Sequence, residues 1–509
     1  MPNVPMTGAE YLESLKDGRE IWLYGERVKD VAAHPAFRNT ARMIARLYDA
    51  LHDPAQKEVL TSPTGDGGFT HKFYLMPKTW QEQLAARDAI AAWARLSYGW
   101  LGRSPDYKAA VMAALQPNAA FYGKYQQNAL AWAKKVQDRT LFVNHAIVHP
   151  PMDRDRPPEK RAESCVHVVK ETDKGIVVRG AKIVATSAAL AHCTIVAHQG
   201  VMQVQDPRYA CAFMVPMGTP GVKVICRGSY EQSAAVMGSP FDYPLASRMD
   251  ENDAICIFDD ALIPWEDVLI SGDTAAANCF SSASGMLPRA LLHGCTRLAV
   301  KLDFTCGLMV KALEAGGTHD FRGQQARAGE LIGYRNLVWS LTEAMARNAA
   351  PWVGGTVLPN AETASAYQAL ASVICPRIRT LIFESVGSGL IYVTSHAKDF
   401  QVPELKPLLE KYVRGSCGYT AEQKMKVMKL LWDSVGSEFG GRSELYEMNY
   451  LGAPEATKVM ALELANTTGA LSRMKALADK CMADYDLDGW IAKDLVDPSD
   501  VSFHSRRYR

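Results

Sequence analysis

Arg103 and Tyr107 are the first side chains whose types and spacing could together bind an anion. They are four residues apart, so on one helical turn they project from the same face. A guanidinium can bind an oxyanion through two hydrogen bonds, and a phenol hydroxyl can donate a further one. Pro105 suits the first turn of a helix, and Ser104 before it is a good N-cap. The pattern therefore fits an anion site in a cleft, and equally a capped helix start with a surface arginine.

His145 is a third candidate, in the segment NHAIVHPPMDR at residues 144–154. Residues before about 140 show helical spacing, whereas those after it are β-branched and aromatic in short runs. Pockets form preferentially where two domains meet. A histidine there can move a proton near neutral pH, although a lone histidine is more often structural.

The elements that must position these side chains fall into three blocks. Helical periodicity marks residues 81–98, 108–115 and 125–136, and it returns over most of residues 289–481. Between them, short runs bounded by Gly, Pro or Asp predict strands of a small antiparallel barrel or sandwich. The expected strands are residues 141–148, 166–170, 175–183, 194–198, 210–215, 222–227, 254–258 and 268–270.

We therefore expect an α+β fold that is mostly α, arranged as in acyl-CoA dehydrogenases. An N-terminal helical domain covers residues 1–140, a middle antiparallel β-barrel residues 141–275, and a C-terminal helical bundle residues 276–483. Residues 484–509 form a polar tail that we expect to wrap a neighbouring subunit or to fray. Such likeness in element order says nothing about the reaction.

Composition excludes several classes of protein. Of 509 residues, 48% are hydrophobic and 22% charged, which is enough apolar material for a folded core. The net charge of +1 provides no basic field for nucleic acid, and no apolar run is long enough to span a membrane. The 11 cysteines form no CxxC pair, which argues against disulfides and structural zinc, so we expect no metal site. No signal peptide is visible, and we expect a reducing cytoplasm.

The sequence also lacks the usual nucleotide-binding motifs. Gly387 and Gly389 begin a GxGxxG-like pattern, but Tyr392 stands at its third glycine. There is no Walker A loop, HExxH motif or GxSxG elbow. Reducing equivalents would therefore have to arrive on a diffusible carrier.

Taken together, these segments resemble the 4-hydroxyphenylacetate 3-hydroxylase family, the oxygenase components of two-component phenol monooxygenases. The resemblance covers nearly the whole chain, and its order and spacing are more specific than any single motif. It includes residues 7–15, 102–107, 145–154, 180–187, 300–304, 439–446 and 485–490.

The resemblance implies roles for particular residues. Arg103, Tyr107 and His145 match the catalytic residues that surround the phenol and the reactive edge of the flavin. Cofactor-binding positions match at Pro151, Met152, Asp153 and Arg154 in a flavin loop, at Thr186 near the isoalloxazine ring, and at Gly440, Gly441 and Arg442. Substrate contacts are implied at His198 and Gln199, where the local sequence differs from the family. His293, with Arg442, matches substrate-facing positions of chlorophenol and nitrophenol oxygenases and is a second acid/base candidate. Residues 203–208 would correspond to a lid.

The family also implies a chemistry and its partners. In the family, FAD arrives as FADH₂ from a separate NAD(P)H:flavin reductase. O₂ converts the reduced flavin to a C4a-hydroperoxyflavin, so the cofactor itself activates the oxygen. The protein must hold the phenol as its anion and exclude water. We expect a homotetramer, because the family assembles flavin sites from more than one subunit and the helical back half offers large apolar faces. The resemblance leaves open whether the substrate is a 4-hydroxyphenylacetate-like acid or a simple phenol, and whether chloride or nitro is displaced.

Three alternatives come from other classes. A 4-hydroxybutyryl-CoA dehydratase-like lyase would need an iron–sulfur cluster, but no cysteine lies near Tyr98–Tyr107, and Cys295 and Cys306 lack the expected spacing. An acyl-CoA dehydrogenase-like enzyme would need a carboxylate base, for which Glu384 and Glu438 are available. A non-catalytic helical scaffold is the third.

Overall fold

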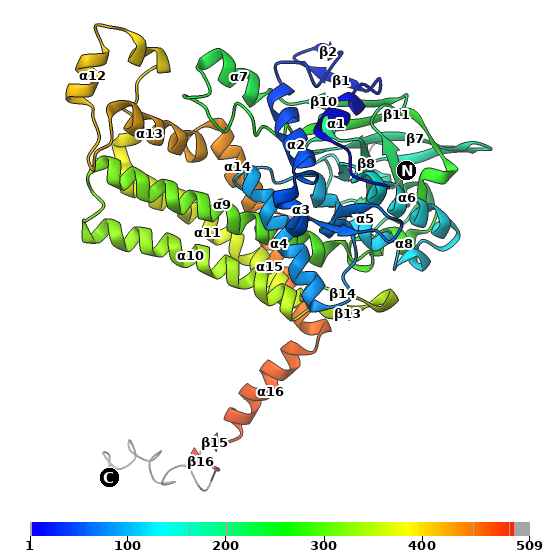
Figure 1. Cartoon of the computed structure of the whole chain (residues 1–509). Coiled ribbons are helices and arrows are strands. Elements are labelled where there is room, and N and C mark those ends of the chain that lie inside the picture. Colours follow the sequence, from blue (N-terminus) through cyan, green and yellow to red (C-terminus); the bar gives the residue numbers. More distant parts are fainter. Residues whose placement is uncertain (1–2, 162, 200–201, 451, 488, 493–509) are drawn as a thin grey trace.

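The computed structural model describes residues 3–161, 163–199, 202–450, 452–487 and 489–492. Figure 1 shows a helical and a β-rich part side by side, with one helix, α16, projecting from the body. The expected order of a helical front, a β middle and a helical back is confirmed.

The front of the chain is built from short helices and one long one. The longest, α4, is capped by Thr79, whose side chain accepts from the Glu82 backbone N–H. A small hairpin, β3 (Thr61–Pro63) and β4 (Phe69–His71), lies between α3 and α4. The helices are α1 (Gly8–Ser14), α2 (Arg38–Ala50), α3 (Pro54–Leu60), α4 (Trp80–Leu96), α5 (Ala109–Met112) and α6 (Gln126–Arg139).

The middle of the chain forms two sheets. One has the order β2-β1-β10-β11-β7-β6 and the other β12-β9-β8-β5, and Phe213 of β9 packs edge-on against Phe258 of β11. The strands are β1 (Glu20–Leu23), β2 (Glu26–Val28), β5 (Val143–Val148), β6 (His167–Thr172), β7 (Gly175–Lys182), β8 (Cys193–Gln199), β9 (Cys211–Pro216), β10 (Val222–Cys226), β11 (Ala254–Pro264) and β12 (Val268–Ser271).

Two features correct the expectation of a middle antiparallel barrel. The described strands form two sheets instead of one closed barrel, and β5 pairs with β8, and β1 with β10, in parallel. In addition, β1 and β2 come from the first 30 residues, which we expected to belong to the helical front. Strands this short carry too little alternation to stand out from flanking helices.

The back of the chain is a bundle of long helices. Helix α7 (Tyr230–Met237) precedes it, and a hairpin of β13 (Ala350–Trp352) and β14 (Thr356–Leu358) joins α10 to α11. The expected helix at residues 454–481 is broken by Gly469, whose φ is +73°. The helices are α8 (Thr274–Ala283), α9 (Met286–Gly316), α10 (Arg322–Arg347), α11 (Ala361–Val386), α12 (Lys406–Tyr412), α13 (Ala421–Val435), α14 (Glu438–Met448), α15 (Pro454–Thr467) and α16 (Ala470–Met482).

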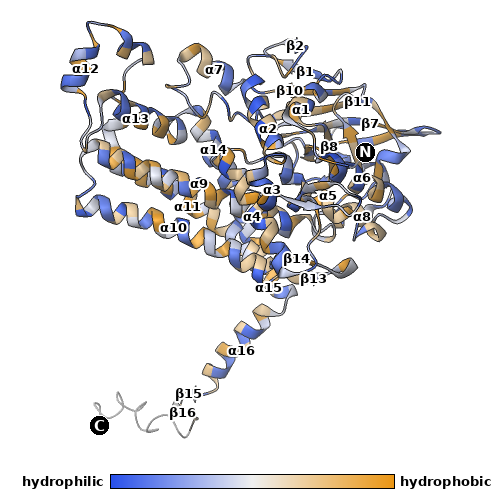
Figure 2. Ribbon diagram, viewed as in Figure 1, coloured by the Kyte–Doolittle hydropathy of each residue, from blue (hydrophilic) through white to orange (hydrophobic). Residues whose placement is uncertain are grey.

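One large apolar core runs through all three parts of the chain. Apolar residues concentrate inside the body in Figure 2, while α16 alternates polar and apolar residues outside it. None of the described helices combines the length and apolar character that a membrane crossing needs. The short strands β15 (Tyr485–Asp486) and β16 (Gly489–Trp490) follow α16, and the rest of the expected tail lies outside the described residues.

Candidate active site

A cavity of about 490 Å³ lies where the β part meets the C-terminal helices. Its volume is in the range of small-molecule sites, about 300–1,000 Å³. β5, the segment after β7, the end of β8 and helix α14 contribute to its walls. The lining residues are Arg103, His145, Ile147, Val148, Val184, Thr186, Gln199, Asp253, Arg442, Leu445, Tyr446, Asn449, Gly452 and Ala453.

Arg103 is held among three tyrosine rings at one side of this cavity. Its guanidinium carbon lies 4.0 Å from the centroid of Tyr107, 4.6 Å from Tyr446 and 5.2 Å from Tyr450. Nη1 donates to the Tyr446 hydroxyl, and the backbone N–H donates to Glu251. Burial opposes the charge, but the tyrosines and Glu251 raise the pKa of Arg103 above its ordinary value. Arg103 is therefore a fixed cation beside the cavity.

Two glycines allow the tyrosines to come this close. A Cβ on Gly102 would overlap the ring of Tyr446, whose hydroxyl donates to the Gly102 carbonyl oxygen at 3.0 Å. A Cβ on Gly294 of α9 would overlap the ring of Tyr450, whose hydroxyl donates to Ala290 at 2.7 Å.

Tyr107 and His145 are buried next to Arg103, with their ring centroids 5.7 Å apart. Tyr107 belongs to a 3-10 turn (Pro105–Lys108), and His145 to β5. Tyr107 Oη, His145 Nδ1 and Arg103 Nε have no hydrogen-bond partner of good geometry among the described residues. Buried polar atoms without partners are rare in folded proteins and here point to a polar ligand.

Burial sets the protonation states of these two side chains. It raises the pKa of Tyr107, partly offset by Arg103, so the phenol stays neutral and can donate. Burial and the nearby charge of Arg103 hold the pKa of His145 well below its ordinary value. His145 is therefore a neutral imidazole at pH 7, which can accept a proton.

Arg442 joins the sheet part to α14 through two acids. It donates from Nε (2.9 Å) and Nη2 (2.6 Å) to Asp253, and from Nη1 to Glu251 at 3.0 Å. Thr186 also donates to Asp253, at 2.7 Å. Burial works against the Asp253 carboxylate, but Arg442 and Arg227 lower its pKa. Because Glu251 contacts both arginines, one buried carboxylate fixes the distance between Arg103 and Arg442.

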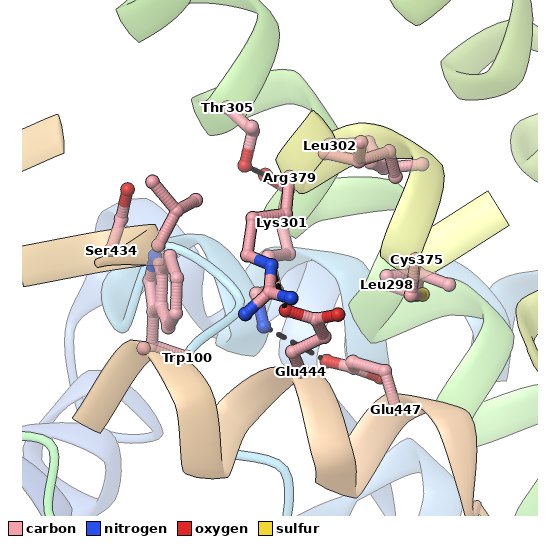
Figure 3. Close-up of a pocket in the computed structure, with 13 residues that line it drawn as sticks. Trp100, Leu298, Lys301, Leu302, Thr305, Cys375, Arg379, Ser434, Glu444 and Glu447 are labelled. Carbon is pink, nitrogen blue, oxygen red and sulfur yellow. Dashed lines mark hydrogen bonds and ion pairs between the residues drawn. The ribbon is translucent and has the colours of Figure 1, made fainter. Parts of the chain in front are cut away.

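The opposite face of α14 is fixed to the bundle by a second polar network (Figure 3). Lys301 of α9 donates to Ser443 at 2.6 Å and to Glu447 at 3.1 Å, and it lies over the Trp100 ring. Arg297 pairs with Glu447 as well, and despite burial these cations lower the pKa of Glu447 to about 2. The space at this network is only about 50 Å³, so it positions α14 and does not form a substrate cavity.

His293 does not line the cavity. It lies behind Tyr107, with ring centroids 5.5 Å apart, and its Nε2 is 3.1 Å from Asp106 Oδ1. Burial opposes the Asp106 charge, but His293 lowers the pKa of that carboxyl. This geometry gives His293 a contact with the turn that carries Tyr107, in place of the expected contact with substrate.

The neighbouring residues His198 and Gln199 lie in different surroundings. Gln199 lines the cavity. The His198 ring lies instead against His149, with 3.0 Å between His198 Nδ1 and His149 Nε2, and Lys182 lies beyond His149. Burial next to Lys182 lowers the pKa of His198 to about 4.

The other residues expected to contact the flavin are not among those that line this cavity. Pro151, Met152, Asp153 and Arg154 form an exposed loop directly after β5. Gly440 is buried where α14 packs on the end of α13, and Gly441 faces open space. In the expected lid, Val204 exchanges two hydrogen bonds with Asn278 of α8.

Sequence reasoning missed several residues of the site. Tyr446 lies four residues after Arg442 on α14, a spacing that places both on one face, so it could have been found. Tyr450, Glu251 and Asp253 carry no such signal, because only the tertiary fold brings them to Arg103 and Arg442.

Two of the alternatives depend on side chains whose positions the structure gives. Among the described residues, no group of three or more His, Cys, Asp or Glu side chains could hold a metal ion. Cys295 is buried, with its thiol donating to Val338 of α10. Glu384 pairs with Arg327 and Arg377 on the bundle surface, and Glu438 is exposed at the start of α14, so neither base candidate lines the cavity.

Comparison with protein families matches nearly the whole chain. Residues 7–270 match the model of the 4-hydroxyphenylacetate 3-hydroxylase N-terminal part, and residues 277–479 match the C-terminal part.

Curated relatives are similar over their full length. The oxygenase component of a Rhodococcus 4-nitrophenol 2-monooxygenase is 52% identical, over 98% of this chain and 96% of the relative. The oxygenase component of 4-hydroxyphenylacetate 3-monooxygenase from Pseudomonas aeruginosa is 50% identical, over 99% and 97%. A solved oxygenase component complexed with FAD and 4-hydroxyphenylacetate has a TM-score of 0.88 at 33% identity, over 94% of this chain and 99% of that one. An archaeal 4-hydroxybutyryl-CoA dehydratase, at 18% identity and a TM-score of 0.81, shares the fold.

Proposed function

Because this chain belongs to the 4-hydroxyphenylacetate 3-hydroxylase family, we propose that it is the oxygenase component of a two-component flavin monooxygenase that hydroxylates a phenol. The observation that carries the proposal is the cavity beside Arg103, Tyr107 and His145, at which one buried polar atom of each side chain has no partner of good geometry among the described residues.

The cofactor is FAD, delivered as FADH₂ by a separate NAD(P)H:flavin reductase through diffusion. The residues present fit such a group, since the cavity has apolar walls for a planar ring and carries Thr186 and the Arg442 guanidinium. As the family resemblance implies, the loop from Pro151 to Arg154 and the Gly440–Gly441 pair contact the rest of the flavin in this proposal. When bound, reduced flavin activates O₂ and supplies the oxygen atom.

The side chains of this chain prepare the substrate. Neutral His145 accepts the phenol proton, Arg103 stabilises the resulting oxyanion, and the Tyr107 hydroxyl donates a hydrogen bond to it. A phenol has a pKa near 10 in water, so an anion at neutral pH needs this stabilisation. The apolar walls exclude water, which protects the reactive oxygen species.

The substrate is a phenol related to 4-hydroxyphenylacetate, hydroxylated next to its hydroxyl group. A chloride or nitro group at the attacked carbon would be displaced by the same reaction. Apart from Arg103, Asp253 and Arg442, the described cavity lining is uncharged, which suits simple or neutrally substituted phenols.

The active form is a homotetramer in the cytoplasm. Apolar side chains on α16, such as Met474 and Leu477, are 62% and 72% exposed and suit a neighbouring copy of the chain. All 11 cysteines are free, which is typical of a reducing compartment.

A reconstituted assay tests the proposal. The purified chain is mixed with a flavin reductase, NADH, FAD and a panel of phenols, chlorophenols, nitrophenols and hydroxyphenyl acids under ¹⁸O₂. Mass spectrometry should find one labelled oxygen in a product, and released chloride or nitrite would identify displacement. Oxygen uptake no greater than with reductase alone, for every phenol, would refute the proposal.

Two variants link the activity to the cavity. Arg103→Ala and His145→Ala should each lower product formation by roughly 10²–10⁴-fold while FADH₂ still binds. Wild-type coupling of oxygen use to product in both variants would remove these residues from the mechanism.

A further inference from the structure

Lys108 is a fully buried lysine directly after Tyr107. Its Nζ lies 3.7 Å from Met286 Sδ and 4.5 Å from the centroid of the Tyr107 ring. Within the described part of the chain, no carboxylate pairs with it. The adjacent Asp106 is engaged elsewhere, 3.1 Å from His293 Nε2 and 2.5 Å from Ser104 Oγ.

The groups around Lys108 make a charged state unfavourable in the empty site. Arg103 precedes it on the same segment, and neutral His145 faces the turn from β5. Helix α9 contributes Met286, the His293–Asp106 pair and Arg289, which donates to the Ala110 carbonyl. Burial and the Arg103 charge hold the pKa of Lys108 well below its ordinary value. A buried amine without an acid partner loses its proton because the uncharged form is cheaper to bury.

We infer that Lys108 is a positioning residue of the phenol site, whose neutral amine takes up a proton when a phenol binds as its anion. One O–H bond of the phenol breaks and one N–H bond forms at Lys108 Nζ, so the site gains no net charge and releases no proton to solvent. This inference rests on the proposed function, because it needs a phenol in the cavity.

The physical reason is the coupling of two charges in a region that excludes water. An oxyanion beside Arg103 and Tyr107 attracts a positive charge at Nζ, and the new ammonium in turn stabilises the oxyanion. At separations below about 10 Å and an effective dielectric constant near 20, such a pair changes an ionisation constant at least about tenfold. The proton that His145 accepts at the cavity wall therefore ends on Lys108 Nζ, which leaves His145 neutral again and places the lasting countercharge behind Tyr107.

The ionisation of bound 4-nitrophenol measures this directly, because its anion absorbs visible light and the neutral phenol does not. The chain is titrated with 4-nitrophenol over a range of pH, anaerobically and with excess FADH₂, so no turnover is needed. Calorimetry in two buffers of different ionisation enthalpy counts the protons released on binding. We expect the wild type to bind the anion below the pKa of free 4-nitrophenol with close to no proton release.

Lys108→Met should weaken ionisation of the bound phenol at least about tenfold, and any anion that binds should release a proton. Lys108→Gln gives the same result if the methionine variant folds poorly, and Lys108→Arg, with a permanent charge, should retain ionisation. Lys124→Met is the matched control, because Lys124 is exposed and lies over Tyr125 away from the cavity.

The outcomes separate the two proposals. Unchanged ionisation and proton count in Lys108→Met and Lys108→Gln would overturn the role of Lys108 and leave the phenol site intact. Failure of the wild type to bind any 4-nitrophenol or other panel phenol would remove the proposed site, and this inference with it.

Discussion

Arg103, Tyr107 and His145 share one buried space but differ in charge and protonation. Arg103 stays cationic, Tyr107 stays a neutral donor, and His145 stays a neutral acceptor, and burial contributes to the last two. The same burial would penalise a bound phenolate unless its charge were matched. The site therefore needs both the fixed guanidinium and groups that can move a proton.

The Tyr107 hydroxyl should matter for the reaction and little for folding. Tyr107→Phe removes one buried donor that has no partner of good geometry among the described residues, so product formation should fall by roughly 10²–10³-fold while stability is kept. Coupled oxygen uptake and thermal unfolding measure the two effects.

Tyr122→Phe is the control for this prediction. Tyr122 is also buried with its hydroxyl lacking a partner of good geometry, but it is outside the cavity lining. Equal losses of activity in the two phenylalanine variants would show that the effect does not arise at the site.

At the scale of elements, sequence patterns identified most of the fold. The runs at 175–183, 194–198 and 222–227 correspond to β7, β8 and β10, because alternation and flanking Gly or Pro mark strands well. The parallel partner of β10 could not be found, since β1 lies about 200 residues earlier in the chain. Periodicity describes one element at a time and carries no information on pairing at that separation.

Helix α9 should tolerate alanine at one glycine and reject it at another. A Cβ at Gly294 overlaps the Tyr450 ring, so Gly294→Ala should cost about 1–3 kcal/mol and displace a ring that flanks Arg103. A Cβ at Gly307, in the same helix, meets open space, so Gly307→Ala should stabilise by up to about 1 kcal/mol. Denaturant unfolding gives both values, and similar effects of the two changes would contradict the packing around Tyr450.

Helix α2 depends on a carboxylate from α7 for its N-terminal cap. Glu231 accepts from the Asn39 N–H at 2.7 Å, the Thr40 N–H at 3.0 Å and the Thr40 hydroxyl at 2.9 Å. Burial nevertheless raises the pKa of Glu231 to about 7, from 4.5. The folded state therefore holds this proton more tightly than the unfolded state, and its contribution to stability is lost as pH rises from 4.5 through 7.

Glu231→Gln should remove this pH dependence. Between pH 5 and pH 8 the free energy of unfolding of the variant should rise relative to wild type by roughly 2.5 kcal/mol. Urea unfolding at a series of pH values measures the difference, with the exposed Glu58→Gln as control. A constant offset across that range would show that Glu231 is ionised alike in both states.

At the scale of the whole molecule, the site joins segments that the sequence keeps far apart. Arg103 and His145 were candidates from their local patterns, and Arg442 from the resemblance to the family. Glu251 could not, since its role depends on contacting Arg103 and Arg442 at once, and these are separated by more than 300 residues. The expectation that His293 faces the substrate came from the family resemblance, and no local pattern could predict that Asp106 Oδ1 lies 3.1 Å from its Nε2.

Helix α16 supports the last prediction, which concerns assembly. From Ser472 onwards its residues are exposed, and Figure 1 shows it extending away from the body. A helix of 13 residues is marginal in water without packing, so its exposed Met474 and Leu477 need an apolar partner. Met474→Gln with Leu477→Gln should therefore shift the proposed tetramer to smaller species in light scattering at micromolar concentration.

The matched control is Ser472→Gln with Lys475→Gln, two residues with the same three-residue spacing on the polar side of α16. It should leave the mass unchanged, and circular dichroism should show the body folded in both double variants. The cavity is built from segments before α16. FADH₂ binding should therefore persist in the Met474→Gln, Leu477→Gln variant if all the flavin contacts lie within one chain. Loss of FADH₂ binding together with the tetramer would place part of the flavin site on a neighbouring copy, whereas a monomeric wild type would refute the assembly itself.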